Sequence, residues 1–142
     1  MRLHDKLLWR GKASNSHTWL YGYLFQDNLT GEKAILKKQT WDENISMADV
    51  LVDEKTISRY SMFQDDAGEK IFEGDVIGNK DGYRYLVKRR RGEWWLYDVN
   101  NIQEDNAISI IGLKESPSVR IRVYVIGNIF DDDINNFITN KL

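Results

Sequence analysis

The sequence predicts an α+β fold that is mostly β, with short strands and a short C-terminal helix. Apolar and aromatic residues alternate with polar ones over several short runs, as they do in half-buried strands. Asp, Asn and Gly separate these runs, and such tight turns between short strands are typical of a small barrel or sandwich. After Asn128 the apolar residues take a helical spacing, which predicts the helix.

The composition is that of one globular domain. The chain has 142 residues, of which 42% are hydrophobic and 30% charged, so disorder is not expected. Its 20 basic and 22 acidic residues leave a formal charge of −2, so binding to nucleic acid or anionic lipid would need a local patch. The absence of cysteine excludes disulfides, thiolate metal sites and a cysteine nucleophile.

The sequence predicts no contact with membranes. Its longest apolar run, residues 19–25, is far shorter than the roughly 18 residues that a membrane-spanning helix needs. Charged residues near the N-terminus interrupt any apolar signal-peptide core. We therefore expect a cytoplasmic protein.

The first predicted element is a hairpin with a long loop. Residues 18–25 form an aromatic run that favours a strand, with Gly22 marking a close backbone approach or a bulge. Turn formers follow, and residues 33–38 supply the second strand. Residues 40–50 show no clear period, so we expect a loop with one helical turn.

The middle of the chain predicts short strands joined by tight turns. Residues 56–63 are expected to be extended and to end in a turn, where Gly68 would take a positive φ. A second turn at residues 73–75 separates two short apolar runs. Residues 83–88 and 94–99 then predict a second hairpin.

The last third predicts two strands and the helix. Residues 107–113 are consistent with a buried strand, and residues 119–125 show the clearest alternation in the chain, just after Pro117. The helix is expected from residue 129 to residue 138, with Asp131 to Asp133 at its positive end.

Three blocks of sequence, in this order, resemble the YopX family of phage and prophage proteins. The first block is Trp19-Leu20-Tyr21-Gly22-Tyr23-Leu24. The second runs from Thr56-Ile57-Ser58-Arg59-Tyr60-Ser61 through Asp65 and Gly68 to Ile71-Phe72-Glu73-Gly74-Asp75-Val76-Ile77. The third is Val125-Ile126-Gly127-Asn128-Ile129-Phe130, after which the chain has Asp131, Asp132 and Asp133 where the family often has Asn-Pro.

The resemblance covers most of the chain and implies a phage or prophage origin. It implies a fold with a part similar to an SH3-like barrel, together with self-association, and it implies no activity. We expect residues 1–142 to form one YopX-like unit, with an N-terminal β-hairpin lobe at 1–55 and a barrel-like part at 56–142.

One group of residues suggests a binding surface for nucleic acid. Cations neutralise phosphates and aromatic rings stack on bases, and both kinds of side chain occur around the second hairpin. Two arginines of the later strand would extend this surface if the strands are neighbours. The alternative is a solvated turn with rings in the core or a subunit interface. The predicted residues are Lys88, Arg89, Arg90, Arg91, Trp94, Trp95, Arg120 and Arg122.

No catalytic, metal or cofactor site is predicted. The two histidines, His4 and His17, lack the spacing of metal ligands, and surface or capping roles are expected for them. The acidic residues 131–133 are expected to compensate the charge of the helix N-terminus. A further group of carboxylates occupies turn positions, where backbone reasons favour acidic residues: Asp65, Asp66, Glu69, Glu73 and Asp75.

The leading functional hypothesis is therefore a non-enzymatic interaction or structural protein that forms homo-oligomers. Aromatic residues make up 12% of this small chain, more than its interior is expected to hold, so some should lie on a contact surface. The alternative hypothesis is a nucleic-acid-binding accessory module that uses the basic hairpin. Neither hypothesis includes a small-molecule substrate.

Overall fold

The computed structural model describes residues 8–37, 43–79, 82–111 and 122–138. The chain divides into two compact units, residues 1–62 and 63–142. The fold is mostly β, and all pairings between the strands named below are antiparallel, as the alternating patterns predict. Among the described residues no helix is both long and apolar enough to cross a membrane.

The first unit is built on four strands in the order β3-β2-β1-β4. These are β1 (Trp9–Lys12), β2 (Trp19–Gln26), β3 (Lys33–Leu36) and β4 (Ser58–Gln64), the last of which carries the chain into the second unit. β2 pairs with β3 from Tyr23 opposite Leu36 to Gln26 opposite Lys33, which confirms the predicted first hairpin. Aliphatic side chains of β3 are buried in the core, as are Ala13 and Val52, which form a β-bridge with each other.

Gly22 is a point of close backbone approach, the first of the two alternatives that the sequence suggests for it. A Cβ at this position would overlap the carbonyl oxygen of Leu36 on the neighbouring strand. Only glycine leaves that space empty, so β3 can lie against the middle of the aromatic strand.

Among the described residues between β3 and β4, two short helices are present. α1 (Met47–Val50) is the single helical turn predicted within residues 40–50, and η2 (Glu54–Thr56) is a 3₁₀ turn. Asp53 begins η2, and its side chain accepts a hydrogen bond from the backbone N–H of Lys55.

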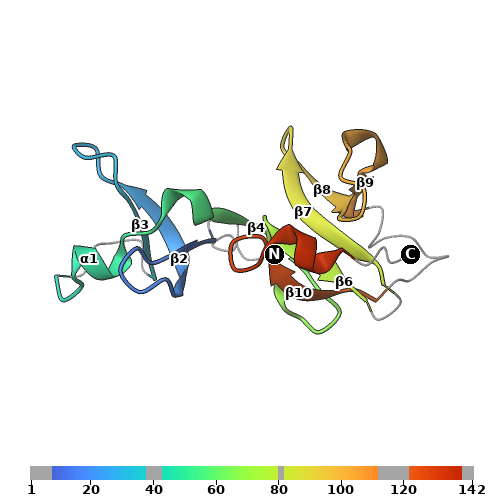
Figure 1. Cartoon of the computed structure of the whole chain (residues 1–142). Coiled ribbons are helices and arrows are strands. Elements are labelled where there is room, and N and C mark those ends of the chain that lie inside the picture. The colour runs from blue at the N-terminus through green and yellow to red at the C-terminus, as the bar shows by residue number, and fades with distance from the viewer. Residues whose placement is uncertain (1–7, 38–42, 80–81, 112–121, 139–142) are drawn as a thin grey trace. The chain divides into compact units, whose positions relative to one another are not determined.

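The second unit contains a sheet with the strand order β10-β6-β7-β8-β9 (Figure 1). Its strands are β6 (Asp75–Gly78), β7 (Arg84–Arg90), β8 (Glu93–Asp98), β9 (Ile108–Ser109) and β10 (Tyr124–Asn128). β5 (Lys70–Phe72) comes before them and follows β4 in the order of the first sheet. Gly68 and Gly74 have φ values of 84° and 87°, which confirms the positive φ predicted at Gly68.

Apolar side chains pack on both faces of the second unit's sheet. One cluster includes Val87 and Leu96, and the other includes Leu86 and Tyr97. Because successive strand residues point to opposite faces, β7 and β8 supply both clusters. Ile134 and Phe137 of η4 (Ile134–Phe137) pack against the second cluster.

The last third of the chain differs from its prediction in detail. β10 begins at Tyr124, later than the predicted strand at 119–125, of which residues 119–121 lie outside the described part. At Val123, hydrogen bonds with Asp66 take the place of pairing with a strand. The predicted strand at 107–113 is only two residues long in the structure, and its residues 112 and 113 are not described.

The predicted C-terminal helix is a 3₁₀ helix of four residues. Asp131 and Asp132 belong to the turn that precedes it, so only Asp133 stands at its N-cap. Neither sheet closes on itself among the described strands, so the structure does not confirm an SH3-like barrel.

Candidate functional site

The predicted basic hairpin is formed by β7 and β8. Arg90 pairs with Glu93, which leaves Arg91 and Gly92 as a two-residue loop. Their φ values are 53° and 78°, and a type I′ turn requires positive φ at both central residues. Arg91 is therefore a non-glycine residue held in the left-handed region at the exposed hairpin tip.

The strand register divides the predicted binding residues between the two faces of the hairpin. Lys88 lies opposite Trp95, and Arg89 lies opposite Trp94. Residues directly opposite one another share a face, whereas successive residues do not. The structure therefore brings Lys88, Arg90 and Trp95 together, and it places Arg89 and Trp94 on the other face.

On the first of these faces the cations lie over aromatic rings. The Arg90 guanidinium carbon is 4.5 Å from the centre of the Trp95 ring and 6.0 Å from that of Tyr97. The Lys88 ammonium is 5.6 Å from the Tyr97 ring. These are cation–π contacts, and they align the two basic side chains along the strand.

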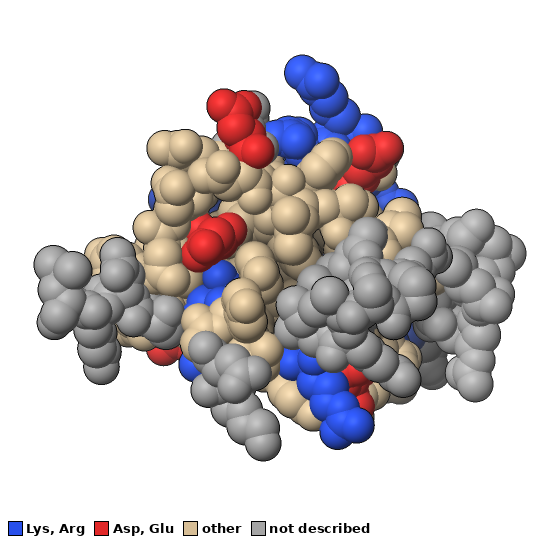
Figure 2. Space-filling view, turned by 90° about the vertical axis from the view of Figure 1, so that its right-hand side faces the viewer, with Lys and Arg blue, Asp and Glu red and all other residues tan. Residues whose placement is uncertain are grey.

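The charge at the tip is mixed. Arg91 and Glu93 are both exposed there. Figure 2 shows Lys and Arg side chains protruding at the upper end of the view, with acidic side chains close by on both sides. The positive potential of this end is therefore local, in keeping with the near-neutral charge of the chain.

The two later arginines do not extend this surface by direct strand pairing. Arg122 is exposed and lies just before β10, while Arg120 is outside the described residues. β10 pairs with β6, and β6 separates it from β7. The condition that the two strands are neighbours is therefore not met.

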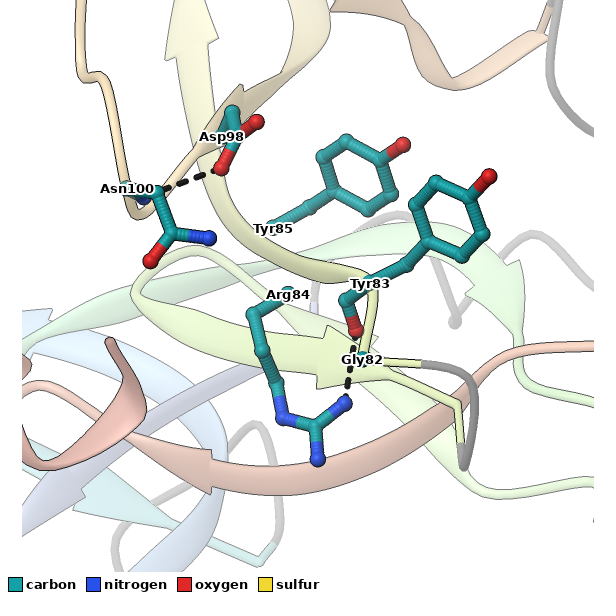
Figure 3. A pocket seen from close by; sticks show the side chains of 6 residues that line it. All are labelled: Gly82, Tyr83, Arg84, Tyr85, Asp98 and Asn100. Atoms are coloured by element: carbon teal, nitrogen blue, oxygen red, sulfur yellow. Dashed lines mark hydrogen bonds between the residues drawn. The ribbon is translucent and has the colours of Figure 1, made fainter. Parts of the chain in front are cut away.

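A pocket of about 220 Å³ lies where β7 begins and β8 ends, and sequence reasoning missed it. The register pairs Tyr85 with Asp98, which brings both strand ends to one place. In Figure 3 the rings of Tyr83 and Tyr85 lie side by side, and the Arg84 side chain turns away from them. The lining residues are Gly82, Tyr83, Arg84, Tyr85, Asp98 and Asn100.

Hydrogen bonds hold the polar side chains of this pocket. Asp98 Oδ1 accepts from the backbone N–H of Asn100 at 2.9 Å. Arg84 Nη1 donates to the carbonyl oxygens of Asn79, at 2.5 Å, and of Tyr83, at 2.8 Å. The two tyrosine ring centres are 6.3 Å apart, and their planes differ by 8°.

The electrostatics of the pocket favour a neutral Tyr85 hydroxyl. Burial raises the pKa of Tyr85 above its ordinary value of 10.0, and the charges of Asp98 and Tyr83 raise it further. Each of these effects penalises the tyrosinate form. Tyr85 therefore remains a hydrogen-bond donor at neutral pH.

The turn carboxylates Asp65 and Asp75 accept hydrogen bonds from the backbone. Asp65 Oδ1 accepts from the backbone N–H groups of Ala67 and Glu69, as the turn interpretation predicts. Asp75 Oδ2 accepts from the N–H of Phe72 at 2.8 Å across the next turn. Among the described residues, no three acidic or histidine side chains are grouped so that they could hold a metal ion.

The first unit also contains a cation–aromatic cluster, which the sequence analysis overlooked. Arg10 is only 5% exposed, and its guanidinium carbon is 4.5 Å from the centre of the Trp19 ring. The Lys12 ammonium approaches the same ring to 5.6 Å. Arg10 and Lys12 are two residues apart, so they share one face of a strand, and this spacing beside an aromatic strand could have indicated the cluster.

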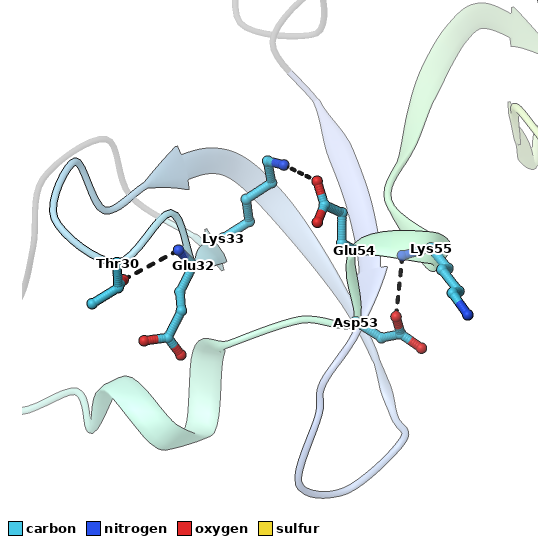
Figure 4. A network of polar contacts seen from close by, with 6 residues as sticks. All are labelled: Thr30, Glu32, Lys33, Asp53, Glu54 and Lys55. Atoms are coloured by element: carbon cyan, nitrogen blue, oxygen red, sulfur yellow. Dashed lines mark hydrogen bonds and ion pairs between the residues drawn. The ribbon is translucent and has the colours of Figure 1, made fainter.

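A polar network lies between the loops and strands of the first unit (Figure 4). Lys33 of β3 forms an ion pair with Glu54 of η2. The glutamate is largely exposed, and exposed ion pairs stabilise a fold by only about 0–1 kcal/mol. The network therefore joins neighbouring segments of the first unit.

Strand β10 carries an exposed apolar surface. Tyr124 and Ile126 are 38% and 41% exposed, and Ile129 just after the strand is 37% exposed. β10 is the edge of its sheet among the described strands. We call these three residues the β10 apolar row.

A family model described as YopX protein matches residues 8–134 of the chain. The match includes both units nearly from end to end and covers the hairpin, the pocket and the β10 apolar row. No curated protein matches the sequence.

Proposed function

The chain belongs to the YopX protein family, and on this basis we propose that it is a non-enzymatic interaction protein that associates with copies of itself. The family resemblance supports a phage or prophage origin, action in the cytoplasm of the bacterial host and an SH3-like relationship for the second unit.

The β10 apolar row is the observation that carries this proposal. Three large apolar side chains are exposed over residues 124–129, which comprise β10 and the residue after it. Removal of apolar surface from water is the main favourable contribution to most association between proteins. An apolar surface at a sheet edge is therefore suited to contact with a second copy.

The contact would use side chains more than backbone groups. The N–H of Val123 donates to Asp66 Oδ2 at 2.6 Å, and the N–H of Val125 donates to Asp65 Oδ2 at 2.9 Å. These carboxylates already accept hydrogen bonds from backbone N–H groups that an added strand would need. We therefore propose that β10 contributes its apolar row to a packed interface and does not extend the sheet into a neighbour.

Light scattering after size exclusion tests this proposal across a wide range of protein concentrations. We expect an oligomer that the Ile126→Asp variant dissociates, because a buried carboxylate would oppose the contact. Ile102→Asp is the matched control, since Ile102 is similarly exposed in a loop outside the row. A monomeric wild-type protein at every concentration would refute the proposal.

Nucleic-acid binding is the second candidate function. The observation that favours it is the alignment of Lys88 and Arg90 over aromatic rings beside the exposed Arg91. Aligned cations suit the regular spacing of phosphates, and binding through them weakens steeply with salt.

Fluorescence anisotropy with labelled single-stranded and duplex DNA and RNA tests this function at several salt concentrations. Reversing Arg89, Arg90 and Arg91 to Glu should abolish binding. The same charge change at three exposed lysines, Lys37, Lys55 and Lys70, is the control and should preserve most of it. Absence of binding by the wild-type protein at low ionic strength would exclude this function.

A further inference from the structure

We infer that the pocket at the base of the β7–β8 hairpin binds a guanine base, which stacks on Tyr83 and donates hydrogen bonds to Asp98. This inference is independent of the proposed self-association. It would add base selectivity to the second candidate function, but it does not require the basic hairpin tip.

The ring geometry favours a flat ligand. Tyr83 and Tyr85 are nearly parallel, with planes 8° apart, and Tyr83 is 49% exposed. A parallel pair with one accessible ring forms a platform on which another ring can stack. An organic cation would be better held by rings that surround it on several sides.

The size of the pocket limits the ligand to about one ring system. Its volume of about 220 Å³ lies below the roughly 300–1,000 Å³ of pockets that enclose drug-sized ligands. A base would therefore occupy the pocket, while its sugar and any phosphate would remain outside.

The carboxylate selects among the bases. Asp98 uses Oδ1 for the backbone N–H of Asn100, and Oδ2 accepts no hydrogen bond from the described residues. An ionised carboxylate only accepts hydrogen bonds. Guanine is the common base that presents two adjacent donors, its ring N–H and its amino group, whereas adenine, cytosine and uracil place an acceptor beside each donor.

The remaining lining groups are compatible with a guanine whose donors face Asp98. Tyr85 is neutral at physiological pH, so it adds a hydroxyl donor and no negative charge. Arg84 is held by two backbone carbonyl oxygens and turns away from the rings in Figure 3. The arginine therefore fixes the start of β7 without competing for Asp98.

Calorimetric titration of the full chain with guanosine, adenosine and uridine tests the inference. We expect saturable binding of guanosine and at least about tenfold weaker binding of the other two nucleosides. Guanosine has no phosphate, so the variant with Arg89, Arg90 and Arg91 reversed should bind it as the wild type does. Failure of the nucleic-acid proposal would thus leave guanosine binding intact.

Two substitutions assign the interaction to the pocket. Asp98→Asn keeps an acceptor for Asn100 but places an amino group in the site, and should weaken guanosine binding by about tenfold. Tyr83→Ala should weaken it by about fivefold or more, while Tyr83→Phe should change it by less than about twofold. Glu93→Gln, at the other end of β8, is the control for loss of a carboxylate.

A parallel titration with oligothymidine, with and without one central guanine, identifies the source of the base. Asp98-dependent binding of guanosine indicates a free nucleoside, and Asp98-dependent binding of the guanine oligonucleotide alone indicates a base within a strand. Either result supports the guanine site. The inference is refuted if neither ligand binds, if adenosine binds equally well, or if Asp98→Asn binds like the wild type.

Discussion

The carboxylate of Asp65 accepts a hydrogen bond from the backbone N–H of Val125 at 2.9 Å, and so joins the turn after β4 to the edge strand β10. Its other oxygen accepts from the N–H groups of Ala67 and Glu69 within the turn. One buried side chain thus satisfies three backbone donors from two segments that are far apart in sequence.

Replacing Asp65 should be costly. Asp65→Ala leaves three donors without their acceptor, and we expect the free energy of unfolding to fall by about 3 kcal/mol. Urea denaturation measures the change. Asp53→Ala is the comparison, because among the described residues this exposed carboxylate accepts a single hydrogen bond, from the N–H of Lys55, and its loss should cost about 1 kcal/mol. Equal losses for both variants would contradict the proposed role of Asp65.

The hairpin turn predicts a stabilising substitution. Arg91 has a φ of 53°, and Asn tolerates this region better than Arg does. Arg91→Asn should therefore raise the free energy of unfolding by about 0.5 kcal/mol. Arg89→Asn, within the strand, should give no such gain because Asn is unfavourable in strands. Denaturation of both variants under the same conditions distinguishes turn geometry from the mere loss of charge.

Alanine substitutions at two glycines distinguish the cost of a steric overlap from the cost of a positive φ. At Gly22 an added methyl group would overlap the Leu36 carbonyl oxygen, so Gly22→Ala should cost about 3 kcal/mol or prevent folding. At Gly31, where φ is 75° and no atom lies within 4 Å of an added Cβ, Gly31→Ala should cost about 1 kcal/mol. Thermal unfolding that ranks the two variants in the opposite order would contradict the close approach.

The raised pKa of Tyr85 predicts that the free energy of unfolding falls at alkaline pH. Its pKa is raised above 10.0 in the folded chain by burial and by Asp98, so the folded state retains a proton that the unfolded state releases. The unfolded state binds fewer protons, and the free energy of unfolding therefore falls as the pH rises above about 10. Tyr85→Phe should show a smaller fall over this range in urea titrations. Identical pH dependence in the two proteins would exclude the contribution.

The sequence alone predicted the local structure where its own pattern controls the backbone. The β7–β8 hairpin and the positive φ at Gly68 follow from neighbouring residues. It also predicted the structural role of Asp65 in its turn, because Asp favours such positions whatever lies beyond them.

Only the tertiary structure decided which side chains meet. Register sets Lys88 opposite Trp95 and Arg89 opposite Trp94, and it brings Tyr85 beside Asp98 across two strands to form the pocket. Likewise, β10 begins where pairing with β6 and the carboxylates of Asp65 and Asp66 allow it, later than its alternation suggests. The physical reason is that pairing with distant segments decides which side chains face one another and where a strand ends, and the pattern within one segment does not identify its partner.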